Sequence, residues 1–150
     1  MTKTAFEFLA LFGCAAFTGT LLTIGISFGK YWKSLGSAEL LEWFSTHPRG
    51  AAQAVPIVLL PTLVGLGGIL WLEWADPTTA LRLWIGAAAT IGVLLVFTVA
   101  YFFPINGKFE SKAIPLAQVP GTLNRWLALH WIRVLLGVVA SLLAFTAVIS

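Results

Sequence analysis

His130 and Arg133 are the residues of this chain best suited to chemistry, because each carries a polar side chain inside a long apolar run. The segment from residue 125 to residue 140 reads RWLALHWIRVLLGVVA. An imidazole can accept or donate a proton near neutral pH, and a guanidinium keeps its charge and can stabilise a developing anion. The alternative is structural, since both side chains could also hold neighbouring helices together through hydrogen bonds.

The spacing puts both residues on one face of a helix. Steps of four, three, four and four residues connect Trp126, His130, Arg133, Gly137 and Ser141. Small residues mark close helix contacts in membranes, whereas an arginine facing lipid at the bilayer centre costs about 2.5–3.5 kcal/mol on insertion scales. We therefore expect this stripe to face the interior of a helix bundle.

The composition is that of an integral membrane protein. Of the 150 residues, 59% are hydrophobic and 10% are charged, whereas a soluble domain carries about 25% charged residues. The net charge of +3 does not indicate nucleic-acid binding, because the basic residues lie in short loops beside apolar runs. With one cysteine and two histidines, one chain can build neither an internal disulfide nor a classical multi-histidine metal site. We therefore expect no metal.

Four apolar runs are each long enough to cross a bilayer as a helix, which takes about 20 residues. They cover about residues 5–28, 51–74, 80–103 and 126–149. Runs of this length are too continuous for barrel strands, and only helices or closed barrels satisfy the backbone in lipid. The sequence therefore predicts an all-α fold, a four-helix bundle in one transmembrane domain over residues 1–150.

The connections between these spans are unequal. Only the short turn EWADPTT joins the second and third spans, so the two longer connections are predicted to lie together on the opposite side. The first long connection contains an amphipathic piece with Ser37 as its expected N-cap. In the second, three prolines and the Asn106-Gly107 pair predict a turn-rich segment that follows the end of the third helix at Pro104.

One end of the predicted bundle gathers further polar and aromatic side chains at the depth of His130 and Arg133. We expect these side chains to bind a substrate: Arg49, Gln53, Tyr101, Asn106 and Trp126. Each also has a plainer interpretation, such as a lipid phosphate contact for Arg49, a turn for Asn106 and an interfacial anchor for Trp126. The prediction of a site rests on their convergence at one end.

Three motifs along the chain resemble those of a known family. RGAAQA opens the second span, FPIN closes the third, and W-x-x-x-H-x-x-R opens the fourth. Over about residues 49–150 the chain resembles the small four-helix membrane proteins grouped with the fungal anthrone oxygenases, whose bacterial members are mostly of unknown function. The connection from Lys30 to Thr46 departs from the usual form of that family, which leaves the identity of the substrate open.

The resemblance implies an oxygenase that converts an anthrone, an activated carbon acid, into a quinone without a metal, a flavin or another cofactor. In such chemistry His130 would be the general base, Arg133 would stabilise the enolate, and Asn106 would orient the oxyanion. The carbanion would then react directly with oxygen. The ligand implied is a lipid-soluble phenolic or quinone-like molecule.

A second hypothesis is a non-catalytic accessory subunit of a larger membrane complex, in which His130 and Arg133 hold the fourth helix in place. The sequence leaves open whether the protein is an enzyme. The expected partners are membrane lipid, an aromatic or quinone-like ligand, and either a larger membrane complex or further copies of this chain. The expected location is the bacterial inner membrane.

The distribution of basic residues predicts the orientation in that membrane. Six Lys and Arg residues flank the long connections and two lie on the other side, so the positive-inside rule places the long connections in the cytoplasm and both termini outside. A reporter fused at Ser150 should therefore signal an exterior C-terminus. A reporter inserted beside Lys108 is the control and should signal the cytoplasm, and reversed signals would contradict the orientation.

Overall fold

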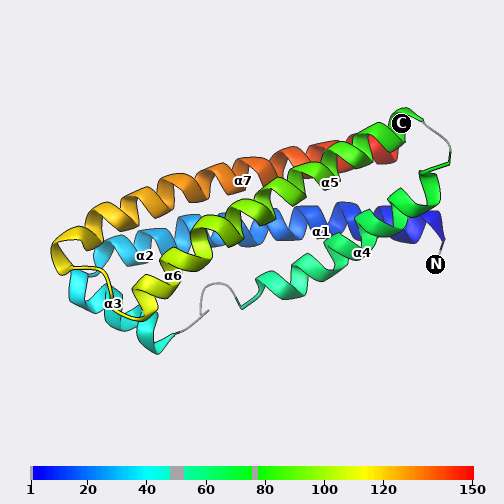
Figure 1. Cartoon of the computed structure of the whole chain (residues 1–150). Coiled ribbons are helices and arrows are strands. Elements are labelled where there is room, and N and C mark those ends of the chain that lie inside the picture. Colours follow the sequence, from blue (N-terminus) through cyan, green and yellow to red (C-terminus); the bar gives the residue numbers. More distant parts are fainter. Residues whose placement is uncertain (1, 48–52, 76–77) are drawn as a thin grey trace.

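Four long apolar helices run side by side and make up most of the structure (Figure 1). The computed structural model describes residues 2–47, 53–75 and 78–150. Within these residues, helices suited to cross a membrane cover Lys3–Ser34, Val55–Glu73, Thr79–Glu110 and Leu116–Ile149, and no strand occurs. The predicted all-α, four-helix membrane fold is confirmed, and the chain is an integral membrane protein.

Helix α1 (Lys3–Thr23) has a central place in the bundle, because it packs against both α4 (Val55–Glu73) and α7 (Val119–Ile149). Helix α5 (Thr79–Phe97) packs along α7. Figure 1 shows the two termini at one end of the bundle and the longer connections at the other, which we call the long-loop end. The prediction that both longer connections share one side is therefore confirmed.

Two spans continue beyond their predicted ends through a wide, π-helical turn. The first passes through η1 (Ile24–Phe28) into α2 (Gly29–Ser34), and the third passes through η3 (Thr98–Phe102) into α6 (Phe103–Glu110). The prediction of a turn-rich segment from Pro104 to the fourth span is therefore wrong at both ends, because Pro104, Asn106 and Gly107 are helical and α7 already begins at Val119.

The wide turn before Pro104 explains this difference. In η3 the N–H of Phe103 bonds to the carbonyl of Thr98, five residues back, rather than to the carbonyl four residues back. A proline in a regular helix lacks one N–H and its ring clashes with the preceding turn. A π-helical turn has one more residue and is wider, so it accommodates Pro104 and the helix continues to Glu110.

Helix α3 (Ser37–Thr46) lies at the long-loop end and packs its buried Leu40, Leu41 and Phe44 against neighbouring elements, including α6. Its first turn is not capped by Ser37 as predicted. Instead the Glu39 carboxylate accepts a hydrogen bond from the N–H of Gly36 at 3.0 Å, as in a capping box. An ion pair between Glu42 of α3 and Lys112, just after α6, also joins the two connections.

Buried apolar side chains form two clusters along the bundle. One fills the middle and includes Val134, and the other fills the long-loop end and includes Leu127. His130 and Arg133 lie between these two residues on α7 and are 0% and 6% exposed. The predicted interior position of the pair is therefore confirmed, at the boundary between the two clusters.

A glycine allows α1 and α4 to approach closely. A Cβ at Gly13 would lie 2.6 Å from the Cα of Thr62, whereas a Cβ at Gly19 on the same helix would meet no atom within 4 Å. Gly13→Ala should therefore force the helices apart and lower the free energy of unfolding by about 1–3 kcal/mol. Gly19→Ala is the control and should be neutral or slightly stabilising. Thermal unfolding in detergent measures both, and equal midpoints would contradict the close contact.

Candidate functional site

His130 joins α7 to α1 through a hydrogen bond across the bundle. Its Nε2 lies 2.8 Å from the carbonyl oxygen of Leu21. Because a carbonyl oxygen only accepts, Nε2 carries the proton and donates it, and Nδ1 of the neutral ring is left with a lone pair. Trp126 stacks on the imidazole with the ring centroids 5.0 Å apart. The ring is thus held in one tautomer and one orientation.

Arg133 lies one helical turn farther along α7 and faces η3. Its Nη1 lies 3.4 Å from Nδ1 of His130 and can donate to that lone pair, and its Cζ lies 4.3 Å from the ring centroid of Phe102. Among the described residues, Arg133 takes part in no ion pair and its Nε has no hydrogen-bond partner. A buried charge is costly unless it is paired, so this guanidinium is suited to an anionic ligand oxygen.

Asn106 and Trp126 form a second polar pair, between α6 and α7. Trp126 donates from Nε1 to Oδ1 of Asn106 at 2.9 Å, which leaves the two N–H groups of the Asn106 amide as available donors. The helical position of Asn106 argues against its interpretation as a turn residue. Both side chains line the same cavity as Arg133, so two kinds of hydrogen-bond donor converge there.

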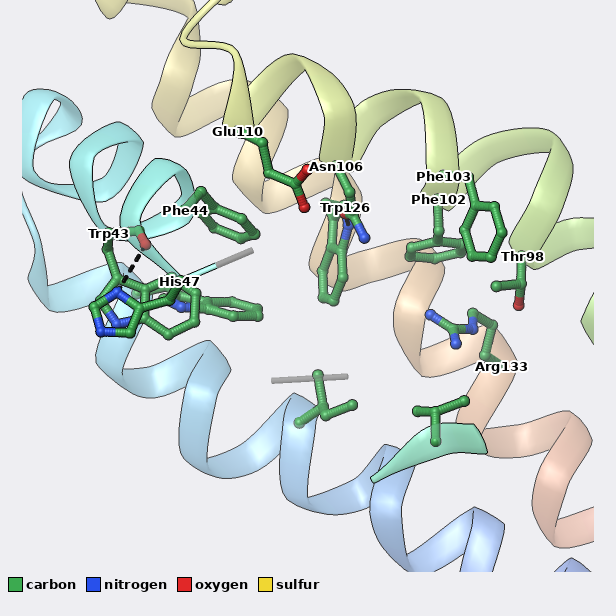
Figure 2. Close-up of a pocket in the computed structure, with 13 residues that line it drawn as sticks. Trp43, Phe44, His47, Thr98, Phe102, Phe103, Asn106, Glu110, Trp126 and Arg133 are labelled. Atoms are coloured by element: carbon green, nitrogen blue, oxygen red, sulfur yellow. Dashed lines mark hydrogen bonds between the residues drawn. The ribbon is translucent and has the colours of Figure 1, made fainter. Parts of the chain in front are cut away.

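Figure 2 shows the residues that line a cavity at the long-loop end. Its volume is about 90 Å³. Six of its thirteen lining residues are Trp or Phe. The Trp32 ring centroid lies 5.4 Å from that of Trp126 and 5.3 Å from that of Trp43. The buried Nε1 of Trp32 is a further donor without a partner among the residues that the structure describes. The site therefore combines apolar walls with unpaired donors, which suits a flat molecule that carries an acceptor oxygen.

A wider groove of about 630 Å³ adjoins this cavity. The two spaces share Val55, Phe103, Asn106 and Glu110. Because an apolar cavity of about 150 Å³ is enough for benzene, the inner cavity alone holds less than one aromatic ring. A polycyclic ligand would therefore place its polar edge inside and its remaining rings in the groove, between the start of α4 and α6.

The predicted site residues are only partly brought together. Arg133, Asn106 and Trp126 line the inner cavity, and Gln53 lines the groove. His130 is buried behind the wall, where it contacts Trp126 and Arg133. The catalytic and binding roles of these residues stay predictions, but their positions show which of them can touch a ligand.

Two predicted binding residues do not belong to the described cavity. Tyr101 lines neither space, and its ring packs near Phe97 and lies 5.9 Å from Cζ of Arg125. Arg49 lies outside the described residues. Binding roles for both stay predictions.

The sequence analysis missed Glu110, which lines both the cavity and the groove. It was counted as part of an irregular connection, although it follows Asn106 by four residues. That spacing puts two residues on one helix face, so it becomes informative once the segment is known to be helical. Thr98 and His47 also line the cavity, and the sequence analysis gave neither a role.

Residues 43–143 match the model of a protein family described as anthrone oxygenase. The match covers about two thirds of the chain and includes every described residue that lines the cavity and the groove except Ile24 and Trp32. No curated protein and no solved structure gives a significant match.

Replacement of His130 should show how far the link from α7 to α1 stabilises the bundle. His130→Leu removes the donor on α7 from the Leu21 carbonyl, which still accepts from the N–H of Ile24 on its own chain segment. We expect it to lower the free energy of unfolding by about 0.5–1.5 kcal/mol. His130→Gln retains an N–H donor and should lose less. The control is His47→Leu, because His47 is exposed and its side-chain hydrogen bonds within the described residues go to Thr46 and Trp43 at the end of α3. Thermal unfolding that gives His130→Leu the wild-type midpoint would contradict the role of this hydrogen bond.

Proposed function

Since the chain belongs to the anthrone oxygenase family, we propose that it oxygenates a lipid-soluble phenolic or quinone-like substrate, without a cofactor, at the long-loop end of the bundle. The observation that carries this proposal is Arg133, a guanidinium with 6% exposure and no ion-pair partner among the described residues, on the wall of an aromatic cavity. An enolate or phenolate oxygen supplies the negative charge that this cation lacks.

In the proposed oxygenation of an anthrone, the main task of the protein is to stabilise the anionic intermediate. An anthrone that loses a proton from its acidic carbon becomes an enolate, with the negative charge shared between that carbon and the oxygen. The carbon then reacts with O₂, and one oxygen atom enters the product as the second quinone carbonyl while the other leaves as water. Donors aimed at the enolate oxygen lower the barrier to its formation.

The donors proposed for that oxygen are the guanidinium of Arg133 and the free N–H groups of Asn106. Asn106 is held by its bond from Trp126 at 2.9 Å, and Arg133 is held by His130 and Phe102. Donors that are already oriented do not have to reorganise during the reaction. The aromatic wall excludes water from the polar edge of the substrate, which strengthens these interactions.

In this proposal His130 positions Arg133 rather than touching the substrate. Its Nε2 proton is committed to Leu21, and its Nδ1 faces Nη1 of Arg133. The role of general base that the sequence analysis predicts for His130 would require a substrate to reach Nδ1 beneath Arg133 and Trp126.

The substrate is proposed to enter from the lipid through the groove between the start of α4 and α6. The groove is lined by apolar side chains as well as polar ones, and Phe103 on its wall is 63% exposed. Apolar surface at membrane depth contacts lipid without cost, so a hydrophobic ligand can reach the site from the bilayer.

Replacement of Arg133 tests the proposed function. Arg133→Met keeps the length of the side chain and removes the charge, so oxygen uptake with an anthrone or a quinol should fall by about 100-fold or more. Arg125→Met is the matched control, because Arg125 lies on the same helix but is exposed and lines neither the cavity nor the groove. An oxygen electrode measures turnover of the purified proteins in lipid.

Wild-type turnover in Arg133→Met would contradict this assignment. A wild-type protein that is inactive on all these substrates, together with loss of a co-purifying membrane protein on replacement of Arg133, would favour the accessory-subunit hypothesis.

A further inference from the structure

Glu110 is a carboxylate on the cavity wall that the mechanism above does not use. It lies at the end of α6 and lines both the inner cavity and the groove. The carboxylates that take part in hydrogen bonds or ion pairs within the described residues belong to other positions, namely Glu7, Glu39, Glu42 and Glu73. Figure 2 shows the Glu110 carboxylate directed toward Asn106 and Trp126. It is therefore a proton acceptor on the wall of the site, with no ion pair or side-chain hydrogen bond among the described residues.

The other candidate bases are less suited to this role. His130 does not line the cavity, and both of its ring nitrogens already have partners. His47 is exposed, stacks on Trp43 with the ring centroids 5.2 Å apart, and lies away from Arg133 at the other end of the cavity (Figure 2). Glu110 remains as the carboxylate on the wall that the cavity shares with the groove.

The absence of a direct ion pair between Glu110 and Arg133 also bears on the choice of the base. Both residues line one cavity, but no ion pair joins them. In an anthrone the acidic carbon and the carbonyl oxygen lie at opposite positions of the central ring, so the base and the cation must stand apart to act on the two ends. A direct ion pair between the two side chains would neutralise both and fill the space that the substrate needs.

We propose that Glu110 is the catalytic base of this site, which takes the proton from the acidic carbon of a substrate whose oxygen is held by Arg133 and Asn106. This inference rests on the proposed function. In the step, the C–H bond breaks, the proton forms an O–H bond with a carboxylate oxygen of Glu110, and the electron pair moves through the ring to the substrate oxygen. The negative charge passes from Glu110 to the enolate, and no oxidant is consumed.

Hydrogen exchange without oxygen tests this step alone. The purified full-length protein in lipid is mixed with an anthrone in deuterated buffer without oxygen, and mass spectrometry follows deuterium entry at the acidic carbon. Glu110→Gln should slow the catalysed exchange by about 100-fold or more. Glu42→Gln is the matched control, because its exposed carboxylate pairs with Lys112 outside the cavity, and it should exchange at the wild-type rate.

A binding measurement separates chemistry from substrate affinity. Fluorescence of the tryptophans around the cavity should be quenched by a hydroxyanthraquinone equally in wild type and in Glu110→Gln, because Arg133 and Asn106 remain in place. If Glu110→Gln does not fold, Glu110→Asp is the second variant. It keeps the carboxylate but shortens its reach, so exchange should slow by about 10-fold or more while binding stays unchanged.

The possible outcomes distinguish this inference from the proposed function. Wild-type exchange in Glu110→Gln, or in Glu110→Asp where only that variant folds, overturns the role of Glu110 and leaves oxygen uptake intact. Exchange that is fast in the wild type and slow in Glu110→Gln, with no oxygen uptake by the wild type, supports Glu110 as the base and overturns the oxygenation. A wild-type protein that does not exchange above the uncatalysed rate overturns the base assignment outright.

Discussion

The arrangement of the long-loop end depends on the hydrogen bond from Nε2 of His130 to the carbonyl oxygen of Leu21. In an apolar interior, an imidazole N–H without a partner is costly, so the bond fixes how α7 is turned relative to α1. Arg133 follows on the next turn of α7 and is thereby directed at Phe102 of η3. The hydrogen bond between α7 and α1 thus determines where the guanidinium of Arg133 lies against η3.

The two π-helical turns bring the remaining walls of the site into position. One begins at Ile24, just beyond Leu21, and the other ends at Phe102, which contacts Arg133. Beyond these turns, α2 supplies Trp32 and α6 supplies Asn106 and Glu110 to one cavity. A π-helical turn changes the facing of the helix that follows it, and such turns occur often at functional sites. Here they let two straight spans continue as cavity walls.

The middle of the bundle and its long-loop end differ in how they are packed. Around Gly13 and Thr62, close backbone packing makes the middle of the bundle dense and apolar. At the long-loop end, aromatic rings surround donors that have no partner among the described residues, namely Arg133 Nε and Trp32 Nε1. Polar groups left unpaired in a native structure call for an explanation, and in the proposed function an acceptor oxygen of the substrate supplies it for these two donors.

The sequence by itself determined the fold class, the four spans and the inward stripe of His130 and Arg133, because hydropathy and helical spacing are local properties of the chain. It also predicted that Asn106 and Trp126 share one end with them. It could not show that the helix continues past Pro104, since this depends on the hydrogen-bond register of the preceding turn, and Glu110 was missed with it. The partner of His130 lies 109 residues away, so only the tertiary structure decided which groups are committed to packing and which are left free to meet a ligand.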